Sequence, residues 1–152
     1  MTNASLAVSY LIKARARLKI LTVLLEEAAY SDTVREAQEI VELACKGMLR
    51  HAGVEPPHWH DVGDLLREFR TRLAPLGDAE IERAVTASAW LRKEREFSFY
   101  GDIDFIPTER YRRDDALRAI DDAQFVVALA GRIIRAVATD SAPGGEDPTT
   151  GR

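Results

Sequence analysis

Two stretches of the chain repeat small and aliphatic residues at alternating steps of four and three, and this spacing limits the possible folds more than any other feature. The repeats are Ala7, Leu11, Ala14, Leu18, Leu21, Leu25 and Ala28, and then Ala116, Ile120, Ala123, Val127, Ala130, Ile134 and Val137. Such steps return a side chain to one face of an α-helix, which has 3.6 residues per turn. Each stretch therefore predicts a long helix packed lengthwise against neighbours in a bundle.

The region between these stretches predicts two more long helices and a short one. The first, capped by Ser31 or Asp32, would end at Gly53, because glycine adopts the left-handed conformation that terminates many helices. A short helix would follow Asp61, and the third long helix would begin at the capping residue Asp78. We therefore expect an all-α, up-and-down bundle of four long helices plus one short helix.

The residues between and after the helices predict an ordered loop and a tail. Residues 97–107 are rich in aromatic side chains and contain glycine and proline, so we expect an ordered loop there. The last long helix would start near Arg112–Asp114. Residues 140–152 have no apolar face to bury, and we expect them to be disordered. The predicted organisation is one helical domain over 1–139 and a disordered tail over 140–152.

The composition indicates a single domain in a reducing compartment. A chain of 152 residues with 46% hydrophobic residues can bury a core without a metal or disulfide. The net charge of -4 argues against a protein that coats nucleic acid generally, although a local basic patch is compatible with it. Cys45 is the single cysteine, so no internal disulfide can form. Lysines and arginines interrupt the first apolar stretch, so neither a signal nor a membrane span is expected, and we predict a cytoplasmic location.

The histidines and the cysteine do not form a recognisable metal site. His51, His58 and His60 are too few and too irregularly spaced for the usual zinc ligand sets, and Cys45 falls within an apolar seam. The interpretation we favour is that Trp59 anchors the proline-rich loop and His60 helps to cap the next helix. Cys45 is expected to be a structural thiol. We expect neither a metal nor another cofactor.

Arginines on both sides of the aromatic segment are the candidates for phosphate binding. They are Arg92 and Arg95 before it, and Arg110, Arg112 and Arg113 after it. If the segment folds back, they would converge beside aromatic side chains available for stacking, which are Phe97, Phe99, Tyr100 and Tyr111. The alternative is a structural network of ion pairs, because the run Arg92–Glu96 carries charges of both signs.

Three segments resemble HEPN domains. They read SYLIKARARLKILTVLLEEAAYSDTVREAQEIVELACKGML, GVEPPHWHDVGDLL and REFSFYGDIDFIPTERY, and the similarity runs from about Ser5 to Val137. The resemblance implies a bundle of four main helices with a short extra one, often dimeric. It also implies a small nucleotidyltransferase encoded nearby, in toxin–antitoxin-like pairs. Many HEPN domains are ribonucleases whose Arg-x4-6-His motifs meet across a dimer, where histidine moves a proton and arginine holds phosphate.

This sequence departs from that motif at the histidine. The best match is Arg95-Glu-Phe-Ser-Phe-Tyr100-Gly101, in which tyrosine replaces the histidine. Tyrosine, with an ordinary pKa of about 10, is a poor general base at neutral pH. We therefore expect a binding module without its own catalysis, which forms a homodimer and acts with a separate small nucleotidyltransferase in a toxin–antitoxin-like or nucleotide-binding system.

Two other functions remain open. One is a metal-independent ribonuclease toxin with an altered active site around Arg95 and Tyr100, helped by His60 or Arg92. The other is adenylylation of an exposed tyrosine by the partner enzyme, with Tyr100 or Tyr111 as the acceptor. Both depend on the same segment at the end of the third long helix.

Overall fold

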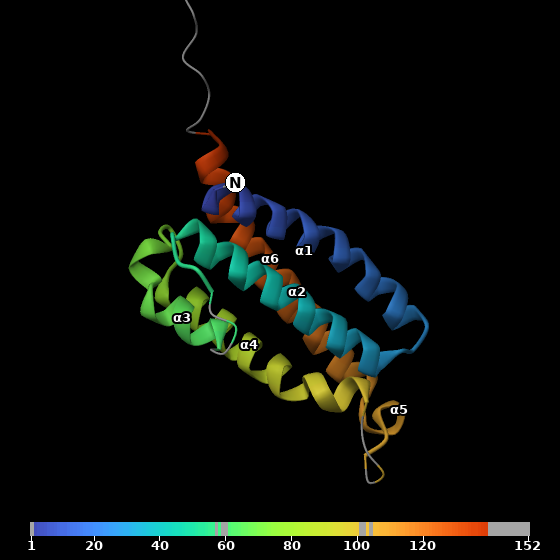
Figure 1. The fold of residues 1–152 in the computed structure, drawn as a ribbon. Helices are drawn as coiled ribbons and strands as arrows, with labels where there is room; N and C mark the ends of the chain where they lie inside the picture. Colours follow the sequence, from blue (N-terminus) through green and yellow to red (C-terminus); the bar gives the residue numbers. More distant parts are fainter. Residues whose placement is uncertain (1, 57, 59–60, 101–102, 104, 140–152) are drawn as a thin grey trace, which may run out of the picture.

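The fold is an all-α bundle built from four long helices. The computed structural model describes residues 2–56, 58, 61–100, 103 and 105–139. The long helices are α1 (Asn3–Glu26), α2 (Tyr30–His51), α4 (Asp78–Phe99) and α6 (Arg113–Thr139), and the short ones are α3 (Val62–Glu68) and α5 (Pro107–Arg110), with a 3₁₀ turn (η1) at Arg70–Arg72. Figure 1 shows the long helices running up and down beside one another. The predicted fold class is confirmed.

α2 lies at the centre of the bundle. It packs against α1, α6, α4 and α3, and Figure 1 shows it between α1 and α4 with α6 behind. Its fully buried residues include Val34, Ala37, Ile40 and Ala44. Gly47 faces both neighbouring helices, because a Cβ there would be in ordinary contact with Ile134 Cδ1 of α6 (3.4 Å) and with the Ala7 carbonyl oxygen of α1 (3.5 Å).

The two predicted seams face the core. On α1, Ala7, Leu11, Ala14 and Leu21 are buried, and on α6, Ala116, Ala123, Val127, Ala130 and Ile134 are buried. Leu18 and Ile120 pack against this core while partly exposed. Ala28 lies beyond the end of α1, with φ of 56° in the turn to α2.

The helix ends agree with the sequence in some places and differ in others. Gly53, with φ of 77°, follows the end of α2, and Asp61 Oδ1 accepts a hydrogen bond from the Gly63 N–H, so the predicted stop and the α3 cap are confirmed. The predicted cap of α2 by Ser31 or Asp32 is wrong. That helix begins at Tyr30 without a side-chain cap, and both residues already belong to its first turn.

The region predicted as a loop, residues 97–107, is partly helical. α4 continues to Phe99, because the run of good helix formers from Arg92 to Glu96 extends the helix beyond the expected boundary. The Ser98 hydroxyl donates to the Arg95 carbonyl oxygen within this last turn (3.0 Å). Pro107 opens α5, as proline suits the first position of a helix. The described residues therefore include two short α-helices, α3 and α5, where the sequence predicted one.

Arginines stacked on aromatic rings link α4 to α6. The Arg118 guanidinium lies 3.9 Å from the centroid of the Trp90 ring, and Arg83 lies 3.8 Å from that of Phe125. Arg83 also pairs with Asp121 at 2.9 Å. These contacts hold one side of α4 against α6, so that another side of α4 faces α2.

The structure does not test two predictions from the sequence, the disordered tail and the cytoplasmic location. Residues 140–152, predicted as a disordered tail, lie outside the described residues. Among the described helices, none combines the length and apolar character that crossing a bilayer requires. The cytoplasmic location stays a prediction.

Candidate functional site

A polar pocket opens between α2 and α4. Its volume is about 330 Å³, and the residues lining it are Glu39, Glu42, Leu43 and Lys46 of α2, Arg92 and Arg95 of α4, and His58 and Val62. The charged residues of α2 follow one another at steps of three and four, so they share one face of that helix. Arg92 and Arg95 are likewise three residues apart. The pocket therefore forms where a charged stripe of α2 meets a charged stripe of α4.

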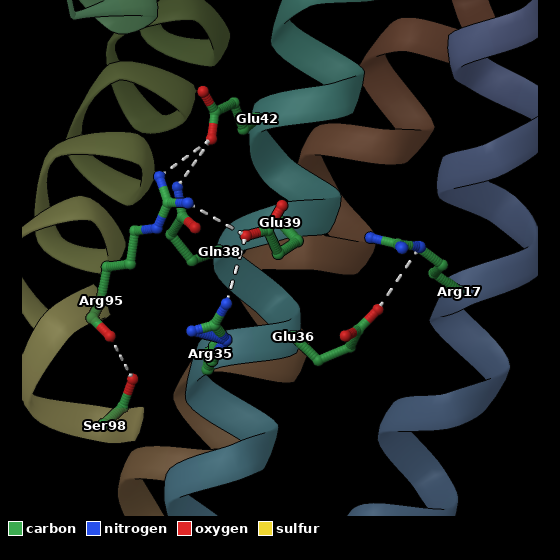
Figure 2. A network of polar contacts seen from close by, with 8 residues as sticks. All are labelled: Arg17, Arg35, Glu36, Gln38, Glu39, Glu42, Arg95 and Ser98. Atoms are coloured by element: carbon green, nitrogen blue, oxygen red, sulfur yellow. Dashed lines mark hydrogen bonds and ion pairs between the residues drawn. The ribbon is translucent and has the colours of Figure 1, made fainter. Parts of the chain in front are cut away.

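Arg95 reaches from α4 to two carboxylates of α2, as Figure 2 shows. Its Nη2 lies 3.5 Å from Glu39 Oε1, and its Nη1 lies 4.0 Å from Glu42 Oε2. Both distances exceed the 2.7–3.2 Å of a normal N–H···O hydrogen bond. The Arg95 side chain is 47% exposed, so these are loose ion pairs in contact with solvent. A ligand can reach the guanidinium without displacing a tight hydrogen bond.

Glu42 is held more firmly than Glu39. Gln38 Nε2 donates to its Oε2 at 3.0 Å, and Lys46 Nζ lies 3.1 Å from its Oε1. Burial alone would raise the pKa of Glu42, but the bonds from Gln38 and Lys46, with the charges of Lys46 and Arg95, lower it below its ordinary value. Glu42 is therefore a fixed anion that orients the cations around it.

Arg92 lies at the other end of the pocket, beside α3. Its Nη1 is 4.0 Å from Asp61 Oδ1, the carboxylate that caps α3. This distance is again too long for a direct hydrogen bond. Lys46 and His58 also line the pocket, so it carries three nitrogen-bearing side chains besides Arg95.

The two candidate tyrosines differ in accessibility. Tyr100 directly follows α4 and is 77% exposed. Tyr111 is buried, and its hydroxyl donates to Glu94 Oε2 at 2.6 Å. Burial, and next the hydrogen bond to the Glu94 carboxylate, raise the pKa of Tyr111 well above its ordinary value. Tyr111 therefore anchors the segment after α4, and of the two only Tyr100 is open to a modifying enzyme.

Two of the aromatic residues expected to stack on a ligand, Phe97 and Tyr111, pack against Phe105 instead. The rings of Phe97 and Phe105 are 5.1 Å apart, and those of Phe105 and Tyr111 are 6.1 Å apart. Arg110, Arg112 and Arg113 are exposed near this cluster but do not line the pocket. The structure thus brings Arg92 and Arg95 together and places the later arginines elsewhere.

A second hollow, of about 260 Å³, lies between the α1–α2 turn and α5. It is lined by residues 27–32, Thr108 and Tyr111. Its described lining contains Glu27 and Asp32 but no lysine, arginine or histidine, so it is unsuited to an anion. The α2–α4 pocket is the better candidate for phosphate.

Sequence reasoning missed Glu39, Glu42, Lys46 and His58 as pocket residues. The available signal was the spacing of the three α2 residues on a face away from the apolar seam.

Cys45 is fully buried in the core, and burial, followed by the charges of Asp61 and Glu42, raises its thiol pKa well above its ordinary value. Trp59, His60 and Gly101 lie outside the described residues. No cluster of three or more metal-binding side chains is found within the described part.

Most of the sequence matches a known family. The HEPN domain family matches residues 7–133, which is most of the chain. The chain belongs to the HEPN family. The resemblance predicted from the sequence is thereby confirmed. In this HEPN domain, the segment compared with the Arg-x4-6-His motif begins at Arg95, within the last turns of α4. It reaches Tyr100, the first residue after α4.

A solved structure has the same fold. The crystal structure of TT1696 from Thermus thermophilus is similar, with a TM-score of 0.66 and 25% sequence identity, over 84% of this chain and 97% of that chain. No curated protein matches the chain. The family and the bundle are thus established, while the nucleotidyltransferase association stays a prediction.

Replacing Tyr111 with Phe tests the anchor after α4. The variant loses the hydrogen bond to Glu94, and we expect the free energy of unfolding at pH 7 to fall by about 1–2 kcal/mol. Because the folded-state pKa of Tyr111 is raised, its contribution is present below the unfolded-state pKa of about 10 and is lost as the pH rises above it. The difference between wild type and Tyr111→Phe should therefore narrow above a pH of about 10.

Urea denaturation at several pH values measures this difference. The exposed Tyr100→Phe is the control, and it should change stability little at neutral pH. A Tyr111→Phe protein as stable as wild type at neutral pH would contradict the anchoring role.

Proposed function

We propose that this HEPN domain is a cytoplasmic binding module without catalysis of its own, and that the α2–α4 pocket binds the phosphate of a nucleotide or of single-stranded RNA. The observation that carries the proposal is the grouping of Lys46, Arg92 and Arg95 in one pocket that includes the motif arginine. The arginines have long ion pairs in the free protein. A phosphate would offer shorter, charge-assisted hydrogen bonds, so it competes well for these side chains.

The missing histidine supports the absence of catalysis. Tyr100 stands in its place, and a phenol is largely protonated at neutral pH. The pocket also carries nearly balanced charge, with two glutamates among its cations. Such a pocket favours selective binding of one group over tight, general binding of a polyanion.

Alanine variants of the pocket arginines test the binding function. Arg92→Ala and Arg95→Ala should each weaken binding of a short, fluorescein-labelled single-stranded RNA by roughly tenfold, because each loses a charge-assisted contact. Arg132→Ala is the matched control, since Arg132 is 46% exposed like Arg92 but pairs with Glu80 away from the pocket. Fluorescence anisotropy measures the affinities. Equal binding by all four proteins would contradict the proposal.

One observation favours a ribonuclease as the alternative. His58 lines the same pocket as Arg95, and an imidazole is the usual proton shuttle near neutral pH. In this alternative the altered site would include Arg95 and Tyr100, with His58 as the base. The binding samples, analysed on a gel, distinguish the two functions. RNA that stays intact supports the binding module, whereas cleavage lost in both Arg95→Ala and His58→Ala establishes the nuclease.

A second part of the proposal is that the chain forms a homodimer through the outward face of α1. An apolar stripe there lies opposite the buried seam, and its most exposed large residue, Ile12, is 61% exposed. The stripe consists of Val8, Ile12, Ala16, Ile20 and Val23. Its spacing is nearly the same in both directions from Ala16, so a second copy running antiparallel would meet the same side chains in the same order. This self-complementarity supports a second copy as its occupant.

A charge placed in the stripe tests the dimer. Wild type should elute as a dimer at micromolar concentration, and Ile12→Glu should be a folded monomer, because the glutamate would be buried without a partner. Ala128→Glu, at an exposed position of α6, is the control and should remain dimeric. Size-exclusion chromatography with light scattering measures the mass. A monomeric wild type would contradict this part of the proposal.

The third part is a separate small nucleotidyltransferase as partner, in a toxin–antitoxin-like system. The exposed phenol of Tyr100 supports this residue as the acceptor of an adenylyl group. Its oxygen would attack the α-phosphate of ATP, and pyrophosphate would leave. We expect co-expression with such an enzyme to add one adenylyl group, seen by intact-mass spectrometry, and Tyr100→Phe to prevent it. Tyr111→Phe should still be modified. An unchanged mass of the wild type would remove this part.

A further inference from the structure

The pair Glu39–Arg95 places acceptors and donors side by side at one end of the pocket. Glu39 Oε1 lies 3.5 Å from Arg95 Nη2 and 4.0 Å from Arg35 Nη2, and both distances exceed a hydrogen bond. Figure 2 shows both guanidinium groups approaching the same carboxylate. A carboxylate has two acceptor oxygens, and a guanidinium has five N–H donors. The pair therefore offers acceptors and, next to them, donors to a ligand.

Glu39 is better placed than its neighbours to accept from a ligand. Glu42 accepts from Gln38 at 3.0 Å and contacts Lys46 at 3.1 Å, so its oxygens are already engaged. Glu36 points to Arg17 of α1, away from the pocket, as Figure 2 shows. Glu39 is thus the carboxylate on this stretch of α2 that lines the pocket with long contacts alone.

Two acceptor oxygens of Glu39 followed by a donor of Arg95 match the hydrogen-bonding edge of only one of the four RNA bases, guanine. Its Watson–Crick edge presents two N–H donors, N2–H and N1–H, and then the O6 acceptor. Adenine and cytosine place a ring-nitrogen acceptor beside one amino group, and that lone pair repels a carboxylate. Uracil presents one N–H between two carbonyl oxygens. A carboxylate that accepts from both N1–H and N2–H, with a guanidinium donating to O6, is therefore specific for guanine.

The dimensions of the pocket suit one nucleotide. Glu39 and Lys46 are two helical turns apart, which is about 10 Å along α2. The volume of about 330 Å³ is at the lower end of ligand pockets, so it accommodates a single nucleotide and not a longer segment. If the base lies at the Glu39 end of the pocket, the phosphate lies near Lys46 and Arg92 at the opposite end.

We infer that the α2–α4 pocket is selective for guanine nucleotides, with the Glu39 carboxylate accepting from N1–H and N2–H of the base and Arg95 donating to O6. Lys46 and Arg92 hold the 5′-phosphate. This inference rests on the proposed function, because the pocket must first bind a nucleotide. It adds the base and assigns Glu39 as the residue that determines specificity.

Calorimetric titration with 5′-GMP, 5′-IMP, 5′-AMP, 5′-CMP and 5′-UMP tests the inference. We expect GMP to bind roughly tenfold or more tightly than AMP, CMP or UMP, as for other paired base contacts. IMP differs from GMP only in lacking the 2-amino group, so its affinity should fall between those of GMP and AMP. Replacing Glu39 with Gln leaves one acceptor oxygen, so Glu39→Gln should lower the GMP affinity to that of AMP. The AMP affinity should rise slightly, because the amide removes the carboxylate that repels the lone pair of the adenine ring nitrogen.

Glu36→Gln is the matched control, on the same helix and with the same chemical change, and it should keep the preference for GMP. Circular dichroism verifies that both variants fold. Equal binding of all five nucleotides, still weakened by Arg92→Ala, would overturn guanine selectivity and leave the proposed function intact. Failure of every nucleotide and of RNA to bind would overturn both. A preference for GMP that survives Glu39→Gln would overturn the role of Glu39.

Discussion

The burial of α2 by the surrounding helices is the constraint on which the rest of the structure depends. Ala37 and Ala44 of α2 are fully buried, and Gly47 faces Ala7 of α1 and Ile134 of α6. Because a helix presents its side chains at 100° intervals, faces occupied by α1 and α6 leave one stripe of α2 turned toward α4. Glu39, Glu42 and Lys46 form the polar part of that stripe. The same helix therefore organises the core and provides one wall of the candidate site.

Local patterns in the sequence were sufficient to predict the bundle. The alternating steps of the α1 and α6 seams depend only on helical periodicity, and Gly53 and Asp61 act within a few residues of themselves. The end of α4 was harder to predict, because the aromatic residues after Arg95 favour no single structure. Phe105 packs against both Phe97 and Tyr111, and the short helix α5 lies between Phe105 and Tyr111 in the chain.

The candidate site was less predictable, since it depends on how α2 and α4 are aligned. Arg92 and Arg95 could be selected from sequence because they share one face and lie near the motif. The partners of Arg95, Glu39 and Glu42, lie on a different helix, far earlier in the chain, and no local pattern specifies that they face Arg95. Arg110, Arg112 and Arg113 were grouped with them on the assumption of a folded-back loop. α5 and the Tyr111–Glu94 hydrogen bond instead hold this part of the chain where its arginines do not line the pocket.

An acidic chain can still take a phosphate ligand when its cations are arranged in this way. Lys46, Arg92 and Arg95 each face a carboxylate in the free protein. A phosphate would therefore replace carboxylates as their partner, and the geometry of donors and acceptors would determine which ligand binds. The most direct test is an NMR titration of the labelled protein with single-stranded RNA, in which the RNA is examined afterwards. We predict that the shifted amides cluster at Glu39–Lys46 and Arg92–Arg95, and that the RNA is recovered at full length. Shifts centred on Arg110–Arg113, or shortened RNA, would contradict the binding function proposed for the pocket.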